Sequence, residues 1–304
     1  MTAHPPMDPE ESPGARQARL GRPLRDIVQD CDTGHRAWLE PTREAYLNST
    51  LTMSVLSSRL HMAKSKISEL FSGRLYPRWD QLAPLALQLS IPTGPLYRLW
   101  RQAAPEIRLK TTTPWREENT TEPDTQPLPP LDHSAFRDLT ETQYDFYAGV
   151  FLPDAERRAA IHDTYDQLWL TWTKALSSAD IRRYAWSVLR TTVMRRTPHF
   201  DGRPRFEHSA FDTLVLRELN GLDHAQQAAD QLVETQDLFR AMSRLPDSQL
   251  DVMVLRALGG LSEEAVSSLL GVPLAGVRSD ERYAIQVLAS ILCCPPHSSE
   301  GNPT

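Results

Sequence analysis

The sequence predicts an all-α protein made of several small helical domains. Apolar residues recur three and four positions apart through most of the chain, which is the period of an amphipathic helix. Glycine, proline and small hydroxyl residues interrupt these segments at positions typical of helix ends. One Pro- and Thr-rich stretch has no apolar period, so we expect it to link two parts of the chain. At 304 residues the chain is long enough for two or three domains.

The N-terminal segment, residues 1–34, begins rich in proline and acidic residues, and we expect a disordered arm with one helical turn near 24–28. It lacks the pattern of a signal peptide. No run in the chain approaches the roughly eighteen apolar residues needed to cross a bilayer. The sequence therefore predicts a cytoplasmic protein with no membrane partner.

Two short helices joined by a tight turn are predicted between Leu51 and Trp79. Helical spacing is kept by Met53, Leu56 and Leu60 before a break at 61–63, and by Ile67, Leu70 and Phe71 after it. Gly73 supplies a left-handed helix stop, and Pro77 keeps the chain from continuing as a helix. An ordinary helical pair in a bundle is the alternative, but it does not require Gly, Pro and Trp at these offsets. The pattern favours a helix-turn-helix.

The second of these helices has a basic, hydroxyl-rich outer face. The residues expected to enter the major groove of double-stranded DNA are Lys64, Ser65, Lys66, Ser68 and Glu69. Eight residues make a rod of about 12 Å, and the major groove of B-DNA is about 12 Å wide. The cations expected to hold the flanking phosphates are Arg59, Arg74 and Arg78.

The charge of the chain is unevenly distributed. Residues 35–104 carry nine cations and four anions, a net charge of +5, although the whole chain carries -6. Phosphate neutralisation needs clustered cations rather than a high overall isoelectric point. The alternative is that these charges form an ordinary solvated surface, but their clustering favours a local contact with nucleic acid.

These residues resemble the lambda-repressor or Xre type of helix-turn-helix domain found in actinobacterial regulators. The matching residues are Leu51, Leu56, Leu60, Lys64, Ser65, Ile67, Leu70, Gly73, Pro77 and Trp79. The resemblance implies a five-helix DNA-binding domain over residues 35–108. The chain departs from the family at His61, where the turn usually has Gly, and at Ala63, which cannot cap a helix as Ser or Thr would.

Residues 109–134 form the predicted linker, and helical periodicity returns in a domain expected at 135–200. Segments 136–151, 155–176 and 178–196 each have an apolar face. The spacing of Trp169 and Trp172 favours a place in a helical core over stacking on exposed bases.

After a connector at 201–235, residues 236–292 contain a second predicted helix-turn-helix, followed by a disordered tail at 293–304. A helix is expected from Pro246 to Gly259, and Ser262 is expected to cap the next helix. Gly271 makes the turn. The helix after it begins at Pro273.

The second half is similar to sigma-70 factors of the extracytoplasmic-function class. Its last domain matches region 4 of that family at Leu245, Pro246, Ser262, Glu264, Val266, Leu270, Gly271, Val272, Pro273, Val277, Arg278 and Ser279. The domain at 135–200 is similar to a divergent region 2. The resemblance implies that RNA polymerase core is contacted by His162, Asp163, Tyr165 and Trp169, and that the helix containing Ala185, Trp186, Val188, Arg190, Arg195 and Arg196 faces the promoter.

The second helix-turn-helix departs from the family in its charge. Its possible DNA contacts are Arg278, Ser279 and Arg282, but Asp280 and Glu281 lie among them, and residues 241–304 carry four cations against seven anions. A net charge of -3 repels DNA.

No site for catalysis, metal or cofactor is predicted. There is no Walker loop, HExxH motif or CxxC pair, and Cys31, Cys293 and Cys294 are too few and too badly spaced for a disulfide framework. Cys293, Cys294 and His297 lack a fourth partner for a metal. His162 and His224 lack a nucleophile and an orienting acid, so we expect a protein that is not an enzyme.

The sequence therefore predicts a DNA-binding transcription regulator in which operator recognition is coupled to RNA polymerase and transcription initiation. The alternative is a degenerate sigma-like module that binds polymerase or an anti-sigma-like partner without contacting a promoter. The acidic residues of the second helix-turn-helix favour that alternative for the second half.

Overall fold

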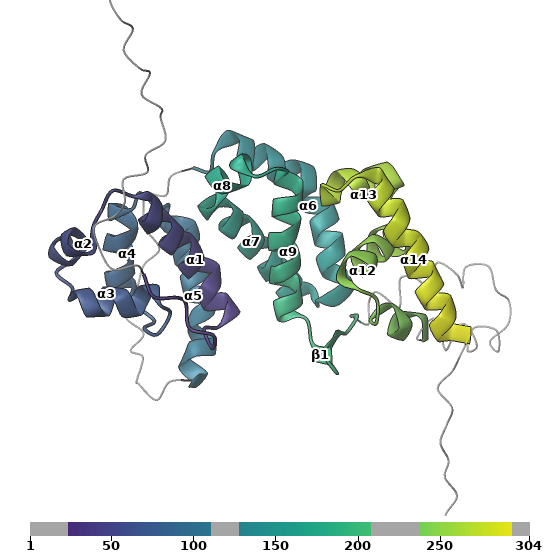
Figure 1. The fold of residues 1–304 in the computed structure, drawn as a ribbon, viewed down its shortest axis with the longest axis horizontal. Helices are drawn as coiled ribbons and strands as arrows, with labels where there is room; N and C mark the ends of the chain where they lie inside the picture. The colour runs from purple at the N-terminus through teal and green to yellow at the C-terminus, as the bar shows by residue number, and fades with distance from the viewer. Residues whose placement is uncertain (1–23, 111–127, 208–236, 294–304) are drawn as a thin grey trace, which may run out of the picture.

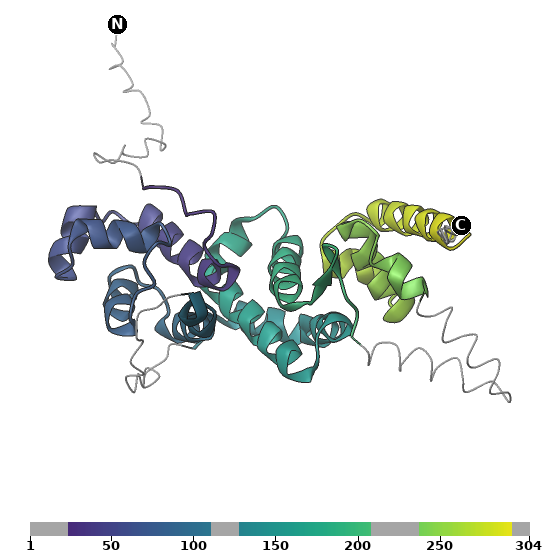
Figure 2. The same ribbon diagram turned by 90° about the horizontal axis from the view of Figure 1, so that it is seen from below.

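The computed structural model describes residues 24–110, 128–207 and 237–293. This part of the chain is helical apart from one two-stranded hairpin, which confirms the all-α prediction. Figures 1 and 2 show three groups of helices in a row, with the N-terminal group at one end and the C-terminal group at the other. None of the described helices is long and apolar enough to span a bilayer.

Five helices form the N-terminal group. They are α1 (Thr33–Asn48), α2 (Met53–Arg59), α3 (Lys64–Phe71), α4 (Trp79–Gln88) and α5 (Thr93–Lys110). One hydrophobic core joins them, with Trp38, Leu56 and Leu82 fully buried. Trp79 packs back onto this core, and its ring centroid lies 5.5 Å from that of Trp100.

The predicted disordered arm at residues 1–34 is too long. Residues 24–30 are not helical, so the expected turn near 24–28 is wrong, but Ile27 and Val28 pack against the core and Cys31 lies within it. The Val28 backbone N–H donates to the Ser72 carbonyl at 3.0 Å. This segment is held because apolar side chains at its inner face gain more from burial than the extended chain loses in entropy. The rest of the predicted arm, residues 1–23, lies outside the described residues.

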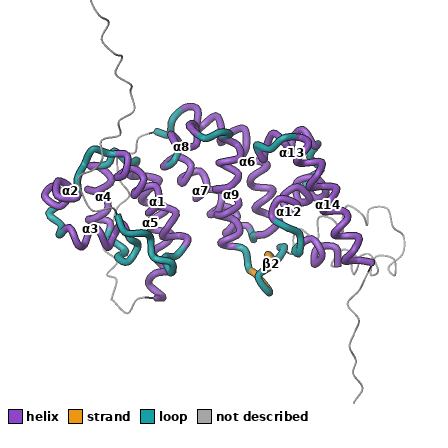
Figure 3. Tube along the Cα trace, viewed as in Figure 1, coloured by secondary structure: helices purple, strands orange, loops and turns teal. Residues whose placement is uncertain are grey.

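The remaining helices follow the predicted linker. They are α6 (Leu131–Phe151), α7 (Asp154–Leu170), α8 (Trp172–Ser177), α9 (Ile181–Arg196), α12 (Asp247–Met253), α13 (Glu263–Leu270) and α14 (Leu274–Cys293), with a π-helical segment η1 (Val254–Leu258) continuing α12. A hairpin of β1 (His199–Phe200) and β2 (Arg203–Pro204) follows α9, and Figure 3 shows its place at the edge of the helices. The expected continuous helix over 155–176 is interrupted at Thr171.

The two helical domains predicted in the second half share one hydrophobic core. It runs from Phe136 in α6 to Leu288 in α14 and includes Trp172, which fills the core as expected. Trp169, for which a core position is also expected, is half-buried and lies outside this core. The linker ends earlier than predicted, because His133 is buried and its Nε2–H donates to the Tyr165 carbonyl at 3.0 Å. Most of the predicted linker and connector, and the tail after Cys293, lie outside the described residues.

A buried carboxylate joins the two parts of this core. Asp251 in α12 accepts hydrogen bonds from the Tyr147 hydroxyl at 2.6 Å, the Trp186 indole at 2.8 Å and the Arg190 guanidinium at 3.1 Å. Burial raises the pKa of Asp251, and Arg190 and the two neutral donors partly offset that rise. We call these four residues the Asp251 cluster.

The N-terminal group lies against α7. Arg98 in α5 makes a bidentate ion pair with Asp166 in α7, with nitrogen to oxygen distances of 2.8 and 2.6 Å. Lys174 in α8 pairs with Glu44 in α1 at 2.9 Å. These contacts join segments on either side of the linker. They hold the N-terminal group, which contains the candidate DNA contacts, against the second half of the chain.

Candidate nucleic-acid interface

The turn between α2 and α3 has the tight geometry that the sequence predicts. His61 adopts a left-handed backbone with φ 49°, which supplies the conformation usually given by glycine. The Met62 N–H donates to the Ser57 carbonyl at 3.2 Å, and the Ser57 hydroxyl donates to the Met62 carbonyl at 2.7 Å. Ala63 precedes α3 without a side-chain cap, as expected. The reciprocal bonds through Ser57 fix the angle between the helices.

One face of α3 is buried in the core, and this packing fixes the direction in which the opposite face points. Ile67, Leu70 and Phe71 are at most 1% exposed, and the Phe71 ring stacks on Tyr46 at 4.8 Å. Rotation of the helix would expose these side chains to water, at a cost of about 1.5–3 kcal/mol for each. On the opposite side Lys64, Ser65 and Glu69 are exposed, and Lys66 and Ser68 are half-buried.

The end of α3 is equally constrained. Gly73 has φ 74°, and a Cβ placed there would lie 2.8 Å from the Cys31 sulfur. The Arg43 guanidinium donates to the Phe71 carbonyl at 2.6 Å, and the Trp100 indole donates to the Pro77 carbonyl at 3.0 Å. The segment between α3 and α4 therefore has a defined path.

The cations around α3 differ in whether they have an ion-pair or side-chain hydrogen-bond partner within the described chain. Among the described residues, Lys64, Lys66 and Arg74 make no ion pair. Arg59 donates to the Gln88 side-chain oxygen at 2.8 Å, and Arg78 lies 3.5 Å from Asp80. Lys64, Lys66 and Arg74 can therefore meet phosphates without first breaking an ion pair within the described chain.

The second helix-turn-helix has the predicted backbone but a different surface. The Ser262 hydroxyl accepts from the Ala265 N–H at 3.1 Å, and Gly271 is left-handed with φ 64°. Arg278 donates to Glu263 at 2.6 Å, Ser279 is half-buried, and Arg282 is exposed. Arg278, Ser279 and Arg282 therefore do not form a continuous basic surface.

Helix α9 also packs against this second motif. The Arg182 guanidinium donates to the Ser268 carbonyl at 3.2 Å. A Cβ placed on Gly271 would lie 2.4 Å from the Arg183 backbone nitrogen and 2.6 Å from an Asp180 carboxylate oxygen. The turn of the second helix-turn-helix is therefore covered within the same chain, which its sequence does not indicate.

The four predicted polymerase contacts differ in how exposed their side chains are. His162 is exposed and Trp169 is half-buried, but Asp163 and Tyr165 are 3% and 2% exposed, so the assignment of these two as surface contacts is wrong. Asp163 pairs with Arg196 at 2.6 Å and Arg195 at 3.2 Å. Both side chains point inward because they fall on the faces of α7 that meet α5, α6 and α9.

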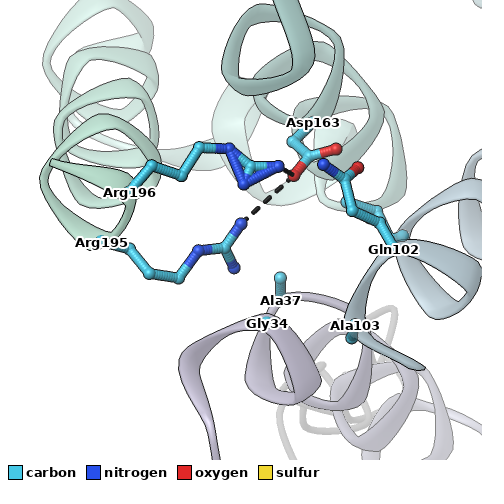
Figure 4. Close-up of a pocket in the computed structure, with 8 residues that line it drawn as sticks. Gly34, Ala37, Gln102, Ala103, Asp163, Arg195 and Arg196 are labelled. Carbon is cyan, nitrogen blue, oxygen red and sulfur yellow. Dashed lines mark hydrogen bonds and ion pairs between the residues drawn. The ribbon is translucent and has the colours of Figure 1, made fainter. Parts of the chain in front are cut away.

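Figure 4 shows Asp163 between its two arginines and the N-terminal group, with Gln102 beside it. With its amide oriented to satisfy both neighbours, Gln102 donates to Asp163 and accepts from Arg196. Burial raises the pKa of Asp163 to about 6, against the attraction of Arg196 and Arg195. No local pattern identifies this cluster, because its members come from three helices far apart in the sequence.

The described residues contain no group of three side chains suited to a metal ion. Cys294 and His297 lie outside the described part of the chain. Comparisons with protein-family models, with curated proteins and with solved structures found no match for this chain.

Proposed function

We propose that the chain is a DNA-binding transcription regulator whose principal DNA contact is the outer face of α3. The observation that carries this proposal is a firmly packed helix-turn-helix with Lys64 and Lys66 on the outer face of α3 and Arg74 just beyond its end, none of which makes an ion pair within the described chain. The resemblance to Xre-type domains supports the same function. Such a face offers charge to phosphates and polar groups to base edges.

In this proposal α3 enters the major groove of double-stranded DNA. The groove-facing residues are Lys64, Ser65, Lys66, Ser68 and Glu69, and Arg74 contacts a phosphate. Lysine can donate to guanine O6 and N7, and glutamate can accept from cytosine N4. Arg59 and Arg78 join the contact after releasing Gln88 and Asp80, so their contribution is smaller than that of Arg74.

The salt dependence of DNA binding tests this contact. Lys66→Ala combined with Arg74→Ala removes two cations from the contact with the DNA polyanion, so the slope of log K against log salt should flatten by about 1.8. Across a fourfold change in salt, that difference amounts to about twelvefold in affinity. The measurement is fluorescence anisotropy of a labelled mixed-sequence duplex titrated with the full chain at several salt concentrations.

Arg278→Ala combined with Arg282→Ala is the matched control, because it removes the same charge from the second helix-turn-helix. Its slope should stay near that of the unsubstituted chain, since Arg278 is paired with Glu263. Equal flattening by both double variants would contradict a contact centred on α3.

For the second half, the pairing of Arg278 and the covered turn favour a protein-interaction module over a second DNA contact. The sigma-like resemblance makes RNA polymerase core the proposed partner, with His162 and Trp169 as its accessible contacts; an anti-sigma-like protein is the other candidate. Capture of purified core polymerase by the full chain, compared with the His162→Ala variant, tests the first partner.

A further inference from the structure

The hairpin after α9 is a rigid projection. Phe200 pairs with Arg203 and His199 with Pro204, and the turn residues Asp201 and Gly202 both have left-handed backbones, with φ 50° and 71°. Two successive left-handed residues make the type of turn whose twist matches a two-stranded hairpin. The turn thus holds Phe200 beside Arg203 without help from a larger sheet.

The base of the hairpin is anchored in the core. The Arg205 N–H donates to the Pro198 carbonyl at 2.9 Å, and the Glu207 N–H donates to the Val150 carbonyl at 2.9 Å. Phe206 packs between Phe151 at 5.2 Å and Phe239 at 4.8 Å. With both ends fixed, the tip extends away from the helices, as Figures 1 and 3 show.

The tip combines an aromatic side chain with cations. Phe200 is 71% exposed, more than any other aromatic side chain among the described residues. Arg203 and Arg205 are exposed and make no ion pair within the described chain, and Asp201 is the one acidic residue between positions 198 and 206. The tip therefore presents an apolar ring next to a net positive charge.

We propose that this hairpin is a second nucleic-acid contact, in which Phe200 stacks on an unpaired base and Arg203 and Arg205 hold the adjacent phosphates. Aromatic rings next to cations are the means by which proteins bind single strands without sequence preference. A specific protein interface needs about 800 Å² on each partner, far more than one exposed ring supplies. Insertion into a membrane interface likewise needs several apolar side chains.

An unpaired base is favoured over a duplex step. An aromatic wedge in a duplex must separate two stacked base pairs, whereas an unpaired base offers its ring without that cost. The site is distinct from α3 and does not depend on the DNA contact proposed there.

The test uses the full chain carrying Lys66→Ala and Arg74→Ala, so that weak strand binding by α3 does not obscure the hairpin. The probe is a fluorescein-labelled oligothymidine of about twelve nucleotides, measured by anisotropy at low salt. Adding Phe200→Ala should weaken binding by about tenfold, and Phe200→Tyr should retain it. Arg203→Ala should flatten the salt slope by about 0.7.

Leu139→Ala is the matched control, because Leu139 is an apolar side chain 74% exposed on α6. It should leave oligothymidine binding unchanged. A loss confined to the single strand, with affinity for a duplex of the same length unaltered by Phe200→Ala, supports the proposal. Unchanged oligothymidine binding by Phe200→Ala, or an equal loss on the duplex, overturns it whatever the outcome for α3.

Discussion

Replacing Asp251 with alanine should release the C-terminal helices from α6 and α9. The carboxylate is 4% exposed and serves three donors at once, from Tyr147, Trp186 and Arg190. Alanine removes the acceptor and leaves these donors inside a core that water does not reach. The effect is on the folded state, because the same groups are hydrated in the unfolded chain.

The loss in the free energy of unfolding follows from the cost of leaving each donor without its hydrogen-bond acceptor. Tyr147 is fully buried and Trp186 is 6% exposed, so each unsatisfied neutral donor costs about 1 kcal/mol or more. Arg190 keeps Asp247 at 2.8 Å as a partner, so its loss is about 1–2 kcal/mol rather than that of an isolated buried charge. The free energy of unfolding should therefore fall by about 3–4 kcal/mol.

Urea denaturation, followed by tryptophan fluorescence, measures this change, and Trp186 lies within the cluster itself. Asp247→Ala is the matched control. Asp247 pairs with the same arginine, but its side chain is 79% exposed, so its loss should cost less than about 1 kcal/mol. Equal destabilisation by Asp251→Ala and Asp247→Ala would refute the view that burial of the acceptor makes the cluster important.

Two further changes probe the backbone and the pH dependence of the fold. Gly271→Ala should lower the free energy of unfolding by more than about 2 kcal/mol, since its Cβ would meet the Arg183 backbone, whereas Gly260→Ala, also left-handed but with open space, should cost about 1 kcal/mol in urea denaturation. His35 is buried, which lowers its pKa to about 4, so the unfolded chain takes up the proton first as pH falls. Stability should thus decline by about 2 kcal/mol from pH 7.5 to 5, and His35→Phe should remove that part of the decline.

Each of these has a result that would count against it. Similar losses at Gly271 and Gly260 would mean that α13 and α9 separate easily. An unchanged pH profile in His35→Phe would mean that His35, stacked on Trp38 at 4.8 Å, accepts a proton in the folded state.

Local features were predicted well because they depend on neighbours in the sequence. The turn through His61, the left-handed stop at Gly73 and the cap at Ser262 all involve residues within one or two helical turns of each other. The same reasoning failed for Asp163 and Tyr165. Helical spacing shows that they share a helix, but not which sides of α7 other helices cover.

The all-α class, the bounds of the short helices and the outer face of α3 can be predicted from the sequence, since periodicity and helix-end residues encode them locally. The packed three-dimensional structure was needed to establish that the two halves of the second core are joined at Asp251, 104 residues from Tyr147, and that Arg98 meets Asp166 across 68 residues. It also decided that Phe200 projects on an anchored hairpin. Such contacts depend on how completed helices pack, because the cost of burying a charge is offset only where distant segments bring its ion-pair and hydrogen-bond partners together.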